Sequence, residues 1–299
     1  ERVSRLRGKI GFYYENLETG ETLTYNGDEV FKAASVIKLP VFMCVAKLVK
    51  EGQLSWDQKF LVREEDKMPS CGALLSLTGD VEIDIESLCR LMITLSDNTA
   101  ANMLMRAVGM ERLKENFEEM GLKKTVAERE LFDSEGAARG LDNYICPSEI
   151  AMLLKKIYNR EFVDEETSEK IENVLLLQQI RHKIPGYIGR KKKIANKTGE
   201  DTGTTHDASV VFARSPFVLV ITSNDTDVPE TERFIREIAL ELYEENGEGE
   251  ISGTSGHIGP MSFLGVALLH FRIGHLPTNN RNGGQYGYYQ LEGLLSLLP

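Results

Sequence analysis

The sequence predicts an α+β fold, in which strands from both ends of the chain share one sheet and the middle is largely helical. Residues 9–31 alternate apolar and polar side chains, and strand-like runs return between residues 193 and 225. The stretch from about 35 to 180 follows a helical period instead. Strands separated by a long helical stretch are typical of α+β proteins. The 299 residues suffice for one large domain or two small ones.

The elements can be assigned in chain order. The alternating stretch at the N-terminus is centred on Glu18-Thr19-Gly20, which predicts a β-hairpin. Helical periods, interrupted by glycine and proline, follow in several segments, of which the clearest are 85–95, 100–120 and 148–162. Strands are predicted at 193–199, 207–214 and 217–225. The amphipathic run that begins at Pro229 predicts a last helix, because proline is tolerated in the first helical turn.

Composition excludes some classes of partner. Apolar residues make up 41% and charged residues 27%, as in ordinary globular proteins, and the net charge is −11. Nucleic acids and anionic membranes favour basic surfaces, so neither is expected as a partner. The four cysteines contain no CxxC pair, which argues against a zinc site and a disulfide scaffold and favours buried thiols. No signal peptide is visible, and the oligomeric state stays open.

The composition changes near residue 248. From residue 251 onward only Arg272, Arg281 and Glu292 carry a formal side-chain charge, and glycine and asparagine become frequent. The apolar run at 261–271 is too short for a transmembrane helix, which needs about 20 residues. The three histidines of this part lack metal-ligand spacing, so no metal site is expected. We therefore predict a domain at 1–248, with a helical subdomain at about 50–180, and an appended tail at 249–299.

Three short motifs carry the chemistry of the sequence. They are Ser35-Val-Ile-Lys38, Ser96-Asp97-Asn98 and Lys197-Thr198-Gly199. Alone, the first could be a helix cap beside a solvated lysine, the second a polar turn and the third the end of a strand. Serine becomes a good nucleophile only when a base removes its proton, and Lys38 can be that base if burial or a nearby cation keeps it partly neutral. Lys197 can be that cation.

The three motifs in this order resemble class A β-lactamases and penicillin-binding proteins. The flanking sequences around residues 88–105, 144–154 and 193–213 resemble those families too, so the likeness covers about residues 8–246. It is strongest to penicillinase-related serine hydrolases of the class A superfamily. The resemblance implies an antiparallel sheet of about five strands, flanked by helices and joined to a largely helical subdomain. It also implies a secreted or cell-envelope enzyme that needs no cofactor.

The resemblance implies a role for each motif residue. Ser35 would attack an amide or β-lactam carbonyl, Lys38 would take its proton, and Ser96 would pass a proton to the leaving nitrogen. Asn98 would hold the substrate amide or orient Lys38. Lys197 would attract a substrate carboxylate, while the strand edge at Thr198 and Gly199 would lie along the substrate. The backbone N–H groups of Ser35 and Glu200 would form the oxyanion hole.

One departure concerns hydrolysis of the acyl-enzyme. Class A β-lactamases activate the water with a glutamate of the pattern E-x-x-L-N. A gapless count back from Pro147 puts Glu130 at that position, with Asp133-Ser134 in place of Leu-Asn, and rival carboxylates at Glu128, Asp133 and Glu135. We predict Glu130 as the base. The departure leaves two alternatives to a β-lactamase: a penicillin-binding protein or covalent penicillin receptor that deacylates slowly, and a related peptidase or esterase.

Smaller departures concern single residues. Class A enzymes often have an arginine after the KTG motif, where this chain has a stretch that contains His206. Arg181 or Lys183 could supply the missing cation, and His206 could be a polar neighbour of the site or purely structural. The position that pairs with Cys89 in many class A disulfides is Phe42 here, so no such bond is expected. Cys71 could line the rim of the site or serve only its loop.

Overall fold

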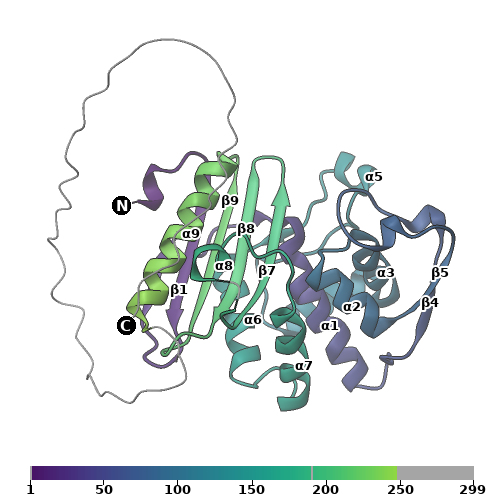
Figure 1. Cartoon of the computed structure of the whole chain (residues 1–299). Helices are drawn as coiled ribbons and strands as arrows, with labels where there is room; N and C mark the ends of the chain where they lie inside the picture. The colour runs from purple at the N-terminus through teal and green to yellow at the C-terminus, as the bar shows by residue number, and fades with distance from the viewer. Residues whose placement is uncertain (1, 190, 248–299) are drawn as a thin grey trace, which may run out of the picture. The chain divides into compact units, whose positions relative to one another are not determined.

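The core of the fold is one antiparallel sheet of five strands, in the order β2-β1-β9-β8-β7 (Figure 1). The computed structural model describes residues 2–189 and 191–247. The strands are β1 (Lys9–Asn16), β2 (Thr22–Tyr25), β7 (Ile194–Asp201), β8 (Thr204–Val211) and β9 (Phe217–Asn224). The N-terminal strands therefore join the C-terminal ones, as the α+β prediction requires. The predicted hairpin is confirmed, because β1 pairs with β2 from Glu15–Thr22 to Phe12–Tyr25.

Helices cover both faces of the sheet. On one face lie α8 (Pro185–Ile188) and α9 (Val228–Glu245), and on the other lie α6 (Pro147–Tyr158) and α7 (Glu165–Leu176) (Figure 1). α1 (Lys38–Lys50) packs against α7 and against the helices of the helical subdomain. Two apolar clusters correspond to the two faces. Strands buried on both faces read as nearly continuous apolar runs, which is why the sequence of β9 does not alternate.

The helical subdomain extends away from the sheet. It contains α2 (Ile85–Thr94), α3 (Asn98–Val108), α4 (Met110–Glu119) and the short α5 (Ser134–Ala138). The predicted run at 100–120 forms two helices, because Gly109 adopts a left-handed φ of +87° between them. The same part of the chain includes two-stranded ribbons that the sequence pattern did not indicate: β4 (Lys59–Val62) with β5 (Val81–Asp84), and β3 (Phe31–Lys32) with β6 (Tyr144–Ile145).

Short 3-10 turns complete the described part of the chain, at Val3–Arg5, Ala34–Ile37, Glu64–Asp66 and Leu74–Ser76. Within residues 2–189 and 191–247, no helix has the length and apolarity needed to cross a membrane. All four cysteines are free thiols, and Cys89 and Phe42 are both buried in the core. The predicted tail at 249–299 lies outside the described residues, so its separation from the domain stays a prediction.

Candidate active site

Ser35 lies on the 3-10 turn Ala34–Ile37 that leads directly into α1. In a 3-10 helix, side chains three residues apart eclipse each other, so Ser35 and Lys38 share one side of this turn. The preceding Ala34 has a φ of +42°, a strained value for a residue with a Cβ atom. Ser35 is half-buried and lines a cavity of about 670 Å³, together with Cys71, Asn98 and Glu200. The turn thus places Ser35 in the wall of this cavity.

Lys38 is almost completely buried beside the Ser96-Asp97-Asn98 turn. Its Nζ donates to the Ser96 carbonyl oxygen at 2.7 Å, to Asn98 Oδ1 at 2.7 Å and to Ser96 Oγ at 3.2 Å. Burial lowers the pKa of Lys38 to about 8, although Cys71 and Asp97 oppose the shift. At pH 7 about one Lys38 in ten is therefore neutral, which a general base requires.

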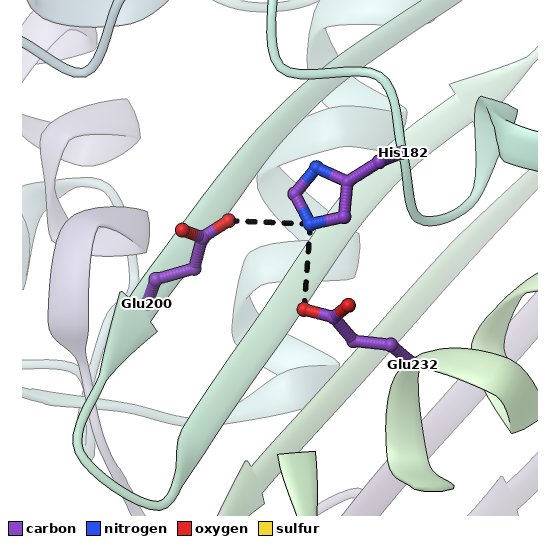
Figure 2. Close-up of side chains that lie close together, drawn as sticks. All are labelled: His182, Glu200 and Glu232. Carbon is purple, nitrogen blue, oxygen red and sulfur yellow. Dashed lines mark hydrogen bonds and ion pairs between the residues drawn. The ribbon is translucent and has the colours of Figure 1, made fainter. Parts of the chain in front are cut away.

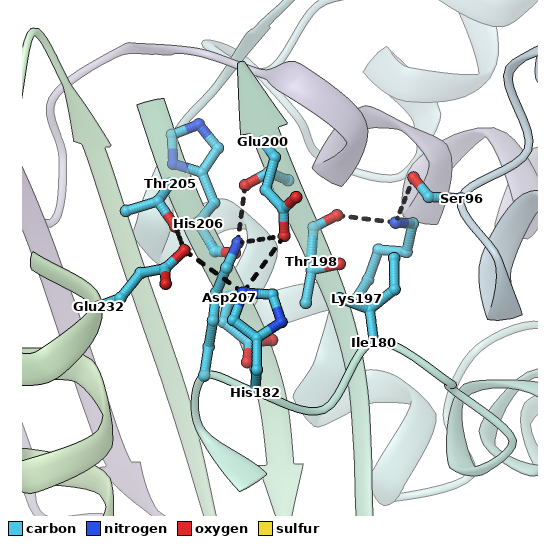
Figure 3. A network of polar contacts seen from close by, with 12 residues as sticks. Ser96, Ile180, His182, Lys197, Thr198, Glu200, Thr205, His206, Asp207 and Glu232 are labelled. Carbon is cyan, nitrogen blue, oxygen red and sulfur yellow. Dashed lines mark hydrogen bonds and ion pairs between the residues drawn. The ribbon is translucent and has the colours of Figure 1, made fainter. Parts of the chain in front are cut away.

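Lys197 approaches the same hydroxyl from β7. Its Nζ donates to Ser96 Oγ at 3.1 Å and to the Thr198 carbonyl oxygen at 2.7 Å (Figure 3). Burial, and next the charge of Lys38, lower the pKa of Lys197 well below the usual lysine value. Ser96 Oγ accepts from both amines, so its own hydrogen remains available to a third group. The two lysines and Ser96 together form a buried hydrogen-bonded unit.

The loop between β4 and β5 holds the Ser96-Asp97-Asn98 turn in place. The Asn98 N–H donates to the Cys71 carbonyl oxygen at 3.2 Å, and the Cys71 thiol donates to the Ser96 carbonyl oxygen at 3.1 Å. The Asp97 carboxylate caps α3 and also accepts from the Leu74 N–H at 2.9 Å. Gly72, with a φ of +122°, packs directly against Asp97. Cys71 therefore both lines the cavity and supports its loop.

The end of β7 lies against the Ser35 turn. A Cβ atom on Gly199 would lie 3.2 Å from the Ser35 nitrogen and 3.1 Å from the side chains of Val36 and His206. Glycine allows this close approach directly, whereas a residue with a Cβ atom would require these neighbours to shift slightly. It brings the next residue, Glu200, to the wall of the same cavity as Ser35. The predicted oxyanion hole of Ser35 and Glu200 is compatible with this placement and stays a prediction.

The candidate cations Arg181 and Lys183 do not line the cavity. Lys183 is fully buried, and its Nζ contacts the carbonyl oxygens of Gly199 and His206 and the Glu200 carboxylate, each at 3.1 Å. The Arg181 guanidinium donates to backbone carbonyl oxygens near the start of β7. Both side chains therefore stabilise the strands beside the site. They are not placed to meet a substrate carboxylate in the cavity.

His206 has a structural role. Its Nδ1 accepts from the Ser223 N–H at 3.0 Å, so its Nε2 donates to the Lys32 carbonyl oxygen at 2.8 Å. Burial lowers the pKa of His206 to about 4, which keeps the ring neutral. The imidazole links β8 to β9 and to β3. Its polar atoms are thus all used within the fold.

The loop at residues 128–143 forms the opposite wall. Arg129 closes it through an ion pair with Asp142 at 2.8 Å. The Asn102 side chain clamps the backbone of Leu131, accepting from its N–H and donating to its carbonyl oxygen, both at 2.9 Å. Arg129, Leu131 and Phe132 line the cavity. The loop thus lines the cavity with Leu131 and Phe132, and its cavity-lining carboxylate, Asp142, is paired with Arg129.

Glu130 lies differently from what its predicted role needs. Its carboxylate is bound by the Arg106 guanidinium at 2.8 Å, and Glu130 does not line the cavity. Among its rivals, Asp133 caps α5 by accepting from the Gly136 N–H, and Glu128 accepts from the Asp142 N–H at 3.3 Å. Glu135 is exposed in the first turn of α5. A water-activating role for any of the four stays a prediction that this geometry does not favour.

Several cavity residues escaped the sequence reasoning. They are Leu131, Phe132, Asp142, Asn143, Thr204 and Glu232. The sequence offered one signal for Leu131, whose backbone Asn102 binds. Asn102 follows Asn98 by four residues, so both side chains lie on the same face of α3. Glu232 carried no signal, because it lies in a helix remote in sequence from every motif.

Comparisons with known proteins agree with this geometry. The model of the beta-lactamase enzyme family matches residues 1–245. The chain is 22% identical over 200 residues to beta-lactamase BRO-1 of Moraxella catarrhalis, covering 65% of this chain and 63% of that protein. It thus spans a little under two thirds of the length of the first curated relatives that it matches.

Two solved structures are similar over most of the described chain. A beta-lactamase from Sphaerobacter thermophilus is 26% identical, has a TM-score of 0.75, and covers 82% of this chain and 94% of that protein. PBP-A is 29% identical, has a TM-score of 0.74, and covers 81% of this chain and 92% of that protein. A variant of PBP-A was solved as an acyl-enzyme complex with penicillin G. The matched fold, the three motifs and the family model agree, and the chain belongs to the beta-lactamase enzyme family.

Proposed function

We propose that the protein is a serine hydrolase that opens β-lactam amide bonds through an acyl-enzyme on Ser35. The observation that carries the proposal is the position of Ser96 Oγ between the buried amines of Lys38 and Lys197, at 3.2 and 3.1 Å, beside the cavity that Ser35 lines. A nucleophile, a base of lowered pKa and a proton donor are the three groups that acyl transfer from an amide requires.

In the proposed reaction, neutral Lys38 takes the Ser35 hydroxyl proton as Oγ attacks the carbonyl carbon. The backbone N–H groups of Ser35 and Glu200 stabilise the negative charge on the carbonyl oxygen. The carbon–nitrogen bond then breaks, and Ser96 gives its proton to the leaving nitrogen. Ser96 recovers a proton from an adjacent lysine ammonium, which completes acylation with all protons accounted for.

The substrate is a small acyl donor with an anionic group. Lys197 and Thr198 would attract its carboxylate, while Asn98 would hold its amide beside the Gly199 edge of β7. The scheme needs no metal or organic cofactor. From family membership we also propose that the protein works outside the cytoplasm, secreted or within the cell envelope.

A penicillin-binding protein with slow deacylation is the second candidate, and one observation favours it. The loop at 128–143 lines the cavity with Leu131 and Phe132, while its carboxylates Glu130 and Asp142 are held by Arg106 and Arg129. Apolar side chains cannot activate a water for attack on the ester. The acyl-enzyme should then form readily and persist. A peptidase or esterase with the same nucleophile would share this first step.

Intact-mass spectrometry of the protein mixed with a penicillin separates these functions. A mass increase that appears and decays while the drug is consumed supports a β-lactamase, and one that persists supports the penicillin-binding protein. The Ser35→Ala variant should show neither. A mass increase of equal size in that variant, or none in the wild type, contradicts acylation of Ser35 by penicillins and directs the search to esters and peptides.

A further inference from the structure

Three potential metal ligands converge beside the cavity from distant parts of the sequence. His182 lies in the segment before α8, Glu200 near the end of β7 and Glu232 on α9 (Figure 2). His182 Nε2 is 3.6 Å from Glu200 Oε1 and 3.3 Å from Glu232 Oε1. One ligand atom from each residue lies within 4.8 Å of the other two. The three side chains point toward one common space.

Two of the three separations between these atoms fit a tetrahedral metal ion. Zinc binds histidine nitrogen and carboxylate oxygen at about 2.0–2.2 Å, so two ligands of a tetrahedral site are about 3.3 Å apart. The two separations from the His182 nitrogen agree with this value. A histidine with two carboxylates also leaves one position open, as zinc sites with three protein ligands do.

Neighbouring groups hold the three side chains in place. The Thr205 hydroxyl donates to Glu232 Oε1 at 3.2 Å (Figure 3). Arg236 donates to the His182 carbonyl oxygen at 3.3 Å. Such outer contacts orient ligands in metal sites. The side chains of His182 and Glu200 are 48% and 51% exposed, so an ion can reach them from solvent.

Lys183 competes for Glu200 without excluding an ion. It contacts Glu200 Oε1 at 3.1 Å, but a carboxylate has about four lone-pair sites, so acceptor capacity remains. Glu200 can therefore contact an ion and the Lys183 ammonium together.

We propose that His182, Glu200 and Glu232 bind one divalent cation of the zinc type on the wall of the Ser35 cavity. Glu200 and Glu232 both line that cavity, so the open position of the ion is accessible from it. Arg181 and Lys183 supply no free cation to this wall of the cavity. A bound ion would add positive charge there. It therefore favours acyl donors that carry a carboxylate, and this consequence rests on the proposed function.

The test is a titration of the full chain with Zn²⁺ by calorimetry and with Co²⁺ by visible absorption. It is done at about pH 7.5, where an ordinary imidazole is neutral. His182→Gln and Glu232→Gln should each remove one binding event or weaken it by more than about tenfold, since even outer contacts contribute 10- to 100-fold. Glu230→Gln removes the same charge from the same helix and should bind as the wild type does. Circular dichroism establishes that each variant is folded.

Other histidines can bind metal, so the proposal depends on the difference between variants. Unchanged binding in both His182→Gln and Glu232→Gln overturns it, as does equal weakening in Glu230→Gln. The titration contains no substrate and therefore stays informative if penicillins do not acylate Ser35. If they do, Zn²⁺ should change the acylation rate of the wild type and leave that of His182→Gln unaltered. The opposite pattern contradicts the link to the cavity.

Discussion

Replacing Gly72 by alanine should test how strongly the loop between β4 and β5, which contains Gly72, supports the site. A Cβ atom at this position would lie 2.3 Å from Asp97 Cγ and Oδ2 and 2.7 Å from Asp97 Cα. The Asp97 carboxylate cannot simply rotate away, because it caps α3 and accepts from the Leu74 N–H. The loop or the Ser96-Asp97-Asn98 turn must therefore move.

The magnitude follows from two contributions. A residue with a Cβ atom at a φ of +122° costs about 1–3 kcal/mol, and overpacking of a fixed interior costs about another 1–3 kcal/mol. We expect Gly72→Ala to lower the free energy of unfolding by about 4 kcal/mol. Gly79 is the matched control, with a φ of +71° and no atom within 4 Å of its Cβ position. Gly79→Ala should cost only about 1 kcal/mol.

Equilibrium urea denaturation of both variants measures this difference, and acylation rates with a penicillin measure its effect on the site. The folded fraction of Gly72→Ala should also acylate more slowly, because a displaced turn moves Ser96 away from Lys38 and Lys197. Gly79→Ala should acylate like the wild type. Equal losses of stability in the two variants would refute the packing argument.

Three further predictions concern the chemistry. The acylation rate should rise with pH and level off above about pH 8, because Lys38 acts only when neutral and burial lowers its pKa to about 8. A flat rate profile between pH 6 and pH 9 in stopped-flow measurements would exclude Lys38 as the base. Leu131→Glu should accelerate decay of the acyl-enzyme by about 10²-fold or more, because a general base contributes that much and Asn102 fixes the backbone of residue 131 in the cavity wall. Phe132→Glu, at a neighbouring position in the same wall, is the control. An equal effect of both substitutions would argue against a positioned base. Glu130→Gln should leave the decay rate of the acyl-enzyme unchanged. It should lower the free energy of unfolding by less than about 1 kcal/mol, as for other partly exposed ion pairs. A large fall in the decay rate would restore Glu130 as the base.

The sequence predicted the acylating groups because their chemistry depends on residue type. Each motif alone has a structural alternative, but the three together in this order indicate acyl transfer, whatever sequence lies between them. Helical period and strand alternation placed the main elements as well. The placement of Lys183 was out of reach, because nothing in a run of residues indicates that a lysine will be fully buried among the carbonyl oxygens of two strands.

The deacylating side was harder, because loop position cannot be counted along a sequence. The gapless count from Pro147 assumed that the loop has the same length and the same path as in class A enzymes. Here the Arg129–Asp142 ion pair closes the loop, and the clamp from Asn102 places Leu131 at the cavity. Side chains distant in sequence, not the spacing to Pro147, decide which residue faces Ser35. The convergence of His182, Glu200 and Glu232 was hidden for the same reason.

The two halves of the proposed reaction therefore depend on different parts of the fold. The proposed acylating groups lie on the 3-10 turn before α1, at the first residue of α1, just before α3 and on β7. Lys38, Ser96 and Lys197 are buried and joined by hydrogen bonds through Ser96. The loop at 128–143 forms a separate part of the cavity wall, with Leu131, Phe132 and an Asp142 carboxylate that is paired with Arg129. A change in that loop alters neither Lys38 nor Ser96, so turnover can be lost or gained while acylation is retained. The lifetime of the acyl-enzyme, more than its formation, is what should distinguish this chain from a fast β-lactamase.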